Sequence, residues 1–148
     1  MDHIVYLDSR ARELENLTKG LKTMIIRGAM GRKVPHGRVA ESDHLFFIEN
    51  KGDGLVKAKA VVETVFHSGQ LSKEQSAEIV EQHQDQLKLN DALKKRFAGK
   101  RYLVLITLKD FQEVEPFKID RSSYGNMDDW LPVGNIEPLK NNSENDAR

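Results

Sequence analysis

The chain lacks cysteine altogether, and it has no excess of charge of either sign. Among its 148 residues, 23 Lys or Arg balance 23 Asp or Glu. The absence of cysteine excludes a disulfide framework and a thiolate metal site. No apolar run approaches the roughly 18 residues that a membrane-spanning helix needs, and the N-terminus lacks the pattern of a signal peptide. These absences predict a cytoplasmic protein with no membrane segment.

Sequence motifs for metal binding and for nucleoside triphosphate binding are missing as well. The five histidines lie at positions 3, 36, 44, 67 and 83, and no two of them have metal-ligand spacing on one helix face. The segment from Gly28 to Lys33 is glycine-rich and basic but lacks the Gly-Lys-Ser/Thr ending of a phosphate-binding loop. No serine lies in a nucleophile-elbow pattern. We therefore expect neither a metal nor a cofactor.

One segment departs from the even charge distribution. Between Lys19 and Arg38 there are six basic residues and no acidic one. A neutral protein that concentrates positive charge in this way has a surface suited to an anionic partner. Gly28, Gly31 and Gly37 place most of these cations on a surface loop, expected over residues 28–41. The pattern predicts a basic cleft that binds RNA or a nucleotide, and an acidic protein partner is a further possibility.

The remaining pattern predicts one α+β domain over residues 1–140, followed by a disordered tail over residues 141–148. Ser72 and Gln75 form a capping-box pair, and Gly20 is placed to end a helix that Asp8 or Ser9 begins. Pro116 places its strand at an edge or a bulge. An ordered loop is expected over residues 122–130. The expected strands are 3–7, 23–26, 45–48, 55–67, 102–106 and 113–119, and the expected helices are 9–19, 72–87 and 89–97.

The stretch from Gly20 to Arg27 resembles the Gly-x-Lys-x-x-Glu-x-Arg motif of the ASCH family within the PUA-like superfamily. Ser42 to Phe47 is similar to the Gly-Asp and apolar strand of these domains, and the resemblance extends over roughly residues 3–120. It implies a small PUA-like β-barrel with flanking helices. Such barrels generally bind RNA or modified nucleosides beside the motif strand. Two positions differ, since Ile25 replaces the motif Glu and Ser42 replaces the usual Gly.

Some small members of the family are similar to amidohydrolases of acylated cytidine, which use a Lys, a Thr three residues later and a separate Glu. Lys22 matches this Lys, but Ile25 occupies the Thr position, and Thr23 would point to the opposite face of a strand. The resemblance therefore leaves a second hypothesis open, a hydrolase of amidohydrolase or ribonuclease type acting on modified nucleosides or RNA. In it Lys22 is the activator, and Glu63 or Glu49 is the base.

Nucleic-acid recognition combines cations for the phosphates with flat side chains for the bases. For each candidate there is a simpler interpretation, namely a solvated cation, a core aromatic or an exposed strand carboxylate. The residues predicted to bind the nucleic acid are Lys22, Thr23, Arg27, Arg32, Lys33 and Arg38 by charge or hydrogen bonding, and Phe47, Tyr124 or Trp130 by stacking.

Overall fold

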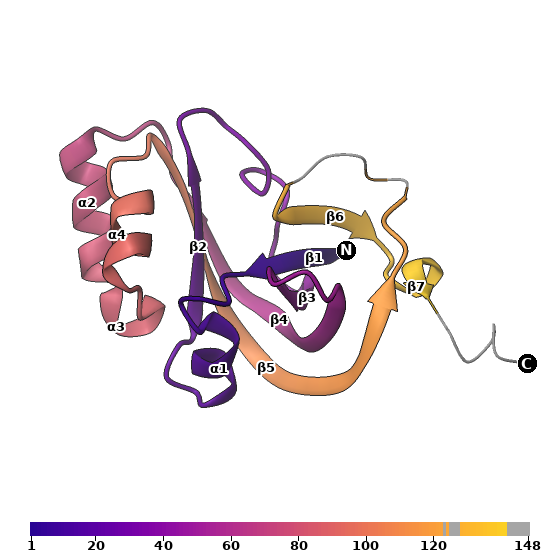
Figure 1. The fold of residues 1–148 in the computed structure, drawn as a ribbon. Helices are drawn as coiled ribbons and strands as arrows, with labels where there is room; N and C mark the ends of the chain where they lie inside the picture. The colour runs from indigo at the N-terminus through magenta and orange to yellow at the C-terminus, as the bar shows by residue number, and fades with distance from the viewer. Residues whose placement is uncertain (123, 125–127, 142–148) are drawn as a thin grey trace, which may run out of the picture.

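A single curled sheet organises the structure, a computed structural model in which residues 1–122, 124 and 128–141 are described (Figure 1). The hydrogen-bonded order is β2-β5-β4-β3-β1-β6, and the short β7 pairs with the end of β5. The strands are β1 (Asp2–Leu7), β2 (Met24–Ala29), β3 (His44–Glu49), β4 (Leu55–His67), β5 (Tyr102–Ile119), β6 (Trp130–Gly134) and β7 (Lys140–Asn141).

The sheet forms a half-barrel rather than a closed barrel. Its two edge strands are β2 and β6, and no pairing joins them in the described part of the chain. The strand β5 is 18 residues long and bends around the molecule, which carries the sheet from the helical side to the C-terminal side (Figure 1). The predicted α+β class is confirmed, and the expected barrel is a half-barrel that stays open between β2 and β6 in the described part of the chain.

Most strands lie where the sequence predicts them. The hairpin of β3 and β4 is present, and the apolar run from Tyr102 pairs with β2 on one side and β4 on the other. The two strands expected over 102–106 and 113–119 are instead one continuous β5. Pro116 lies where the register between β4 and β5 shifts, between the pairs Val56–Phe117 and Ala58–Glu113, so the predicted bulge is confirmed.

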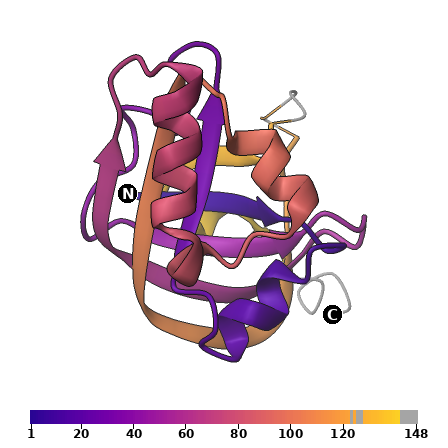
Figure 2. The ribbon, with the colours of Figure 1, turned by 90° about the vertical axis from the view of Figure 1, so that its left-hand side faces the viewer.

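The helices α2 (Lys73–Gln82), α3 (Gln84–Leu87) and α4 (Asp91–Phe97) cover one face of the sheet (Figure 2). The Ser72–Gln75 capping box that begins α2 is confirmed in both directions. The helix α1 (Glu13–Thr18) is shorter than expected, and neither Asp8 nor Ser9 is its N-cap. Arg12 holds that position in a left-handed conformation, and the Asp8 side chain instead accepts the backbone N–H of Ala11 in the preceding turn.

Alternation along β5 separates two layers of core. Val104 and Ile106 point into the half-barrel, whereas Leu103 and Leu105 pack beneath α2 and α4. All four side chains are buried. This period-2 pattern means that a β5 side chain on the Val104 face lines the interior of the half-barrel, and this is the face that carries the candidate site.

Two histidines fasten the basic loop between β2 and β3 to the sheet. His67 accepts the backbone N–H of Gly37 at Nδ1 and contacts the carbonyl oxygen of Val39 through Nε2 at 2.9 Å. Nε2 of His36 lies 2.7 Å from the carbonyl oxygen of Ser68. The loop therefore has a defined position against β4 despite its glycines.

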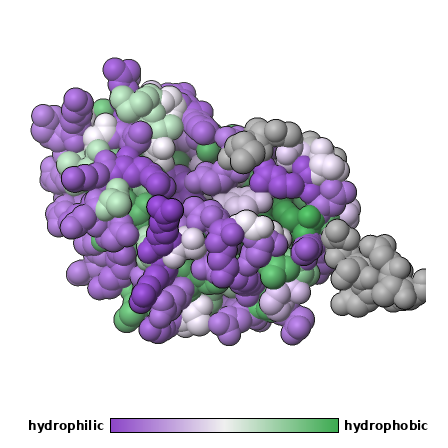
Figure 3. Space-filling view, viewed as in Figure 1, coloured by the Kyte–Doolittle hydropathy of each residue, from purple (hydrophilic) through white to green (hydrophobic). Residues whose placement is uncertain are grey.

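Residues 123 and 125–127 of the predicted ordered loop and residues 142–148 of the predicted tail lie outside the described residues. Asn141 is an exception, because it pairs with Lys118 in β7. No helix in the described part of the chain is long and apolar enough to cross a membrane. On the face of the molecule in Figure 3, hydrophobic residues reach the surface in small areas separated by hydrophilic ones.

Candidate functional site

A cleft of about 320 Å³ lies beside the edge strand β2, where the basic loop, α4 and the segment before β6 meet. We call it the β2–α4 cleft. Its lining residues are Arg27, Gly28, Ala29, Gly31, Lys33, Val34, Pro35, His36, Arg96, Phe97, Tyr102, Val104, Asp128 and Asp129.

Arg27 is the fixed cation of this cleft, and its side chain is only 10% exposed. One terminal nitrogen donates to the carbonyl oxygen of Ile26 at 2.8 Å, and the other donates to that of Tyr6 at 2.7 Å. Its Nε has no hydrogen-bond partner among the described residues, although Asp129 Oδ2 lies 3.3 Å away. The guanidinium is thus held in place, and its buried Nε–H is left without a hydrogen-bond partner among the described residues.

An aromatic wall stands next to the basic loop. Tyr102 lines the cleft, and the guanidinium of Arg32 lies 5.7 Å from the centre of its ring. The ring of His36 meets Tyr102 edge to face, with 5.5 Å between the centroids. Arg32 and Lys33 are exposed, as the sequence predicts for the loop. Together these residues form an aromatic and cationic rim of the cleft.

Sequence reasoning missed Arg96 and Tyr102. Arg96 is the last residue of the basic triplet that ends α4, and only the packing of α4 against β2 brings it to Arg27. The sequence predicts that Tyr102 belongs to an apolar, buried strand. In the structure it is the first residue of β5 and is only half-buried. A polar-ended aromatic at the start of an apolar strand was the available signal for Tyr102. No local pattern distinguishes Arg96 from its neighbours.

Lys22 does not reach this cleft, which is the main correction to the predicted site. Its side chain is 1% exposed; Nζ donates to the carbonyl oxygen of Leu87 and lies 3.4 Å from Glu13 Oε2. Burial lowers the pKa of Lys22, and the nearby Glu13 carboxylate partly offsets this effect. A cation enclosed in this way is a structural partner of Glu13 rather than a contact for a phosphate.

The carboxylates proposed as the catalytic base have other surroundings. Glu49 accepts from Lys57 at 3.1 Å and also pairs with Lys51 beside the β3–β4 turn. Glu63 is exposed on β4. Neither is the carboxylate that Lys22 meets. Thr23 is exposed, but it and Lys22 both precede β2, so the expected alternation of strand faces does not apply to them, and Thr23 does not line the cleft.

Two of the predicted stacking residues belong to the core. Phe47 is fully buried in the half-barrel, where its ring lies 6.0 Å from that of Phe111. Trp130 is 1% exposed, and its indole N–H donates to His3. A base cannot reach either ring without unfolding the sheet, so the stacking role predicted for them is wrong.

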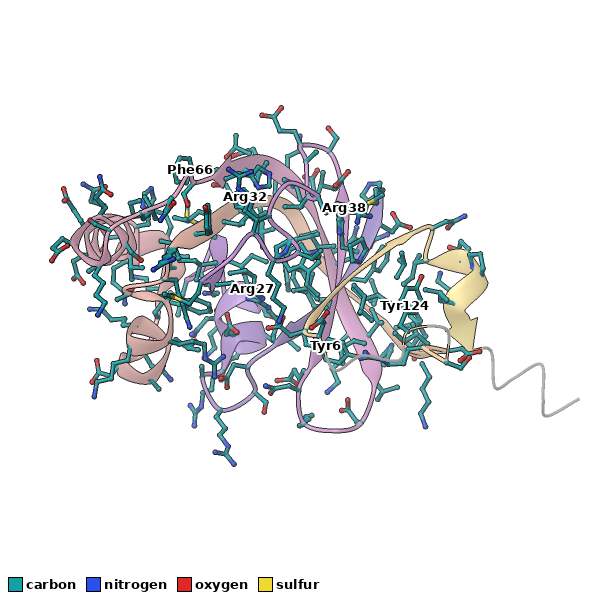
Figure 4. The ribbon with its side chains drawn as sticks, turned by 90° about the horizontal axis from the view of Figure 1, so that it is seen from above. Tyr6, Arg27, Arg32, Arg38, Phe66 and Tyr124 are labelled. Carbon is teal, nitrogen blue, oxygen red and sulfur yellow. The ribbon has the colours of Figure 1, made fainter. Side chains whose placement is uncertain are left out.

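Tyr124 and Arg38 lie away from the cleft. Viewed from above, Arg27 lies between Arg32 and Tyr6, whereas Tyr124 lies toward the C-terminal elements (Figure 4). Tyr124 packs at the edge of the apolar cluster that includes Ile4 and Leu131. Arg38 is exposed but is not among the residues that line the cleft. Of the predicted binding residues, Arg27 and Lys33 therefore line the cleft, and Arg32 lies next to it over the ring of Tyr102.

A larger cavity of about 640 Å³ lies between β3, β4, β5 and the segment after β6. Its charged lining is mainly acidic, with Asp2, Asp110 and Glu137 against Lys59. This balance does not suit a polyanion, so the smaller β2–α4 cleft is the better candidate. The described residues contain no group of three or more histidines and carboxylates that would hold a metal ion.

Comparisons with known proteins find the fold and no more. No protein-family model matches the sequence, and no curated protein matches it. Crystal structures of the ASCH protein from Zymomonas mobilis do match. One, of a point mutant, has a TM-score of 0.68 and 15% identity over 93% of each chain. Another has a TM-score of 0.66 and 15% identity over 89% of this chain and 87% of that one.

Proposed function

We propose that this chain, whose fold is that of the ASCH domains, binds single-stranded RNA or a nucleotide released from it in the β2–α4 cleft. The observation that carries the proposal is a convergence of charge. Arg27 from β2, Lys33 from the loop and Arg96 from α4 line one cavity, although they are far apart in the sequence. Cations gathered from separate elements favour an anionic ligand, because each placement depends on the fold.

The geometry of Arg27 supports a phosphate contact. Its terminal nitrogens are occupied by two carbonyl oxygens, so the side chain is pre-oriented before any ligand arrives. Its Nε–H is buried, has no hydrogen-bond partner among the described residues and faces Asp129 Oδ2 at 3.3 Å, so a ligand that moves Asp129 aside would gain this donor. A phosphate oxygen would accept this N–H in a charge-assisted hydrogen bond, which is worth about 1.5–3 kcal/mol.

Tyr102 and Arg32 support contact with a base. The guanidinium of Arg32 lies over the ring of Tyr102, so a base would stack on the outer face of the guanidinium or replace it on the ring, at about 1–3 kcal/mol per base. The cavity volume of about 320 Å³ lies at the lower end of the range of small-molecule sites, roughly 300–1,000 Å³. This size favours one extruded nucleotide with its neighbours lying across the loop.

The test is binding of a fluorescent single-stranded RNA, measured by anisotropy at low salt. Arg96→Ala should weaken binding about tenfold, since it removes one charged group from the cleft. Lys95→Ala is the matched control, because Lys95 is exposed on the same helix and does not line the cleft. Equal decreases in affinity for the two variants would show that only overall charge matters. Absence of binding by the unmodified protein at low salt would refute the proposal.

Salt dependence provides a second measurement. Arg32→Ala with Lys33→Ala should weaken binding to all RNA sequences alike and reduce the slope of log K against log salt by about 0.7 for each phosphate that the variant no longer neutralises. Arg10→Ala, at an exposed position outside the cleft, should leave the slope unchanged. Binding that ignores salt would contradict the role of the loop as a contact for the RNA backbone.

A further inference from the structure

Two cations of the β2–α4 cleft already form ion pairs with carboxylates of the protein. Asp129 Oδ2 lies 3.3 Å from Nε of Arg27, and Asp128 Oδ1 lies 3.4 Å from Nζ of Lys33. Both acids come from the segment immediately before β6 and line the cleft opposite the basic loop. An anionic ligand that enters therefore competes with the protein's own carboxylates.

These ion pairs have the properties of contacts that a ligand can replace. The side chains of Asp129 and Lys33 are 57% and 62% exposed, and the Arg27–Asp129 pair is not a hydrogen bond. Each pair has one partner that is mostly exposed, so a ligand can take the place of the carboxylate, provided that the ligand's own charge compensates Arg27, whose side chain is only 10% exposed. Arg27 cannot move in the same way, because it is buried and held by two carbonyl oxygens. The acids are thus displaceable, and the cation remains.

Charge balance then restricts the ligand. The cleft is lined by three basic side chains, Arg27, Lys33 and Arg96, and by two carboxylates. A ligand that displaces both carboxylates must bring about two negative charges, or a buried cation loses its counter-charge. A phosphate monoester carries about −1.5 to −2 at pH 7. A phosphodiester within an RNA strand carries a single charge and replaces only one carboxylate.

We propose that the β2–α4 cleft selects a terminal phosphate monoester, as found on a mononucleotide or a phosphorylated RNA end, over an internal phosphodiester. Asp128 and Asp129 are the residues that set this selectivity. The proposal rests on the proposed function, since it concerns the ligand of the same cleft.

The experiment compares RNAs of one sequence that carry a 5′-phosphate, a 3′-phosphate or only hydroxyl ends, with anisotropy as the readout. At least one phosphorylated RNA should bind about tenfold more tightly than the hydroxyl-ended RNA, the equivalent of one added charge-assisted hydrogen bond. Asp128→Asn with Asp129→Asn should strengthen binding of the hydroxyl-ended RNA, because a ligand then has no carboxylate charge to replace and a phosphodiester with a single charge can bind. The difference in affinity between phosphorylated and hydroxyl-ended RNA should therefore become smaller.

Glu113→Gln with Glu115→Gln is the matched control. It makes the same change in net charge at exposed positions of β5 outside the cleft, and the difference between RNAs should persist. Equal affinity of the unmodified protein for all three RNAs would overturn the selectivity while leaving RNA binding intact. If the double variant of Asp128 and Asp129 kept the same difference in affinity between phosphorylated and hydroxyl-ended RNA, the proposed selectivity would also be overturned. If no RNA binds, the proposed function fails together with the selectivity.

Discussion

Trp130 donates its indole N–H to Nδ1 of His3 at 3.0 Å, and this hydrogen bond fixes the protonation state of a fully buried histidine. Because Nδ1 is the acceptor, the proton of the neutral ring lies on Nε2, which donates to Asp43 Oδ2 at 2.8 Å. Protonation of Nδ1 would place two N–H groups against each other. The pair thus ties β1 to β6 and to the turn before β3 only while His3 is neutral.

Acid should therefore weaken the fold through His3. Burial lowers the pKa of His3 below 6.5, and it outweighs the opposing effect of Asp43. The unfolded chain then binds more protons than the folded one below pH 6.5. The contribution of His3 to stability is complete above that pH and is lost as the pH falls toward the lowered value. Urea denaturation at pH 7.5 and 5.5 should show the decrease.

His3→Gln tests that assignment, since an amide can accept from Trp130 and donate to Asp43 but does not titrate. Asp43 stays ionised across this window, because its desolvation is outweighed by hydrogen bonds from His3, Ala40 and the amino terminus, which lower its pKa from 3.8. The other histidines are common to both proteins. An identical decrease in stability between pH 7.5 and 5.5 in both would contradict the prediction.

The buried pair of Lys22 and Glu13 should contribute to stability rather than to ligand binding. Lys22→Met leaves the Glu13 carboxylate unpaired and the carbonyl of Leu87 without a donor, at a cost of about 3–5 kcal/mol. Adding Glu13→Gln removes the stranded charge while keeping an acceptor for the Asp8 N–H, so the double variant should be more stable than Lys22→Met. Urea denaturation of both variants measures the difference. A decrease below about 1 kcal/mol for Lys22→Met would contradict this role.

Gly28 should tolerate no side chain. A Cβ built there lies 2.9 Å from Cδ2 of Leu103 and 3.2 Å from Cγ of Lys100. Gly28→Ala should destabilise the protein by about 1–3 kcal/mol through overpacking against β5. Gly31→Ala, in the loop that follows β2, is the control, because its Cβ would meet nothing within 4 Å. Thermal unfolding should separate the two variants, and equal midpoints would show that Leu103 can move aside.

Local patterns predicted the elements, and the tertiary packing decided the site. The Ser72 capping box and the β3–β4 hairpin depend on neighbours in sequence, and both are present. The strand β6 was missed, because its pairing with β1 joins residues more than 120 positions apart. For the same reason only one part of the cleft lining was predicted. The basic loop is visible in the sequence, whereas Arg96 and the opposing Asp129 reach it only through packing.

The alternative hydrolase hypothesis makes a final prediction, that purified protein leaves N4-acetylcytidine intact over hours. A catalytic lysine must contact its substrate and be held near deprotonation. Burial does lower the pKa of Lys22, but Nζ is enclosed by Leu87 and Glu13. Ile25 occupies the position of the amidohydrolase Thr, three residues after Lys22. It is fully buried and supplies no hydroxyl.

Chromatographic separation of cytidine from its acetylated form is the measurement, and Ile25→Thr should be equally inactive. Because Lys22 is structural, circular dichroism must first show that any Lys22→Ala variant remains folded. Release of cytidine by the unmodified protein, abolished in a folded Lys22→Ala variant, would establish that Lys22 becomes accessible during turnover. The pair with Glu13 would then be a resting state of a catalytic lysine, and the hydrolase would replace the binding module as the better account of this chain.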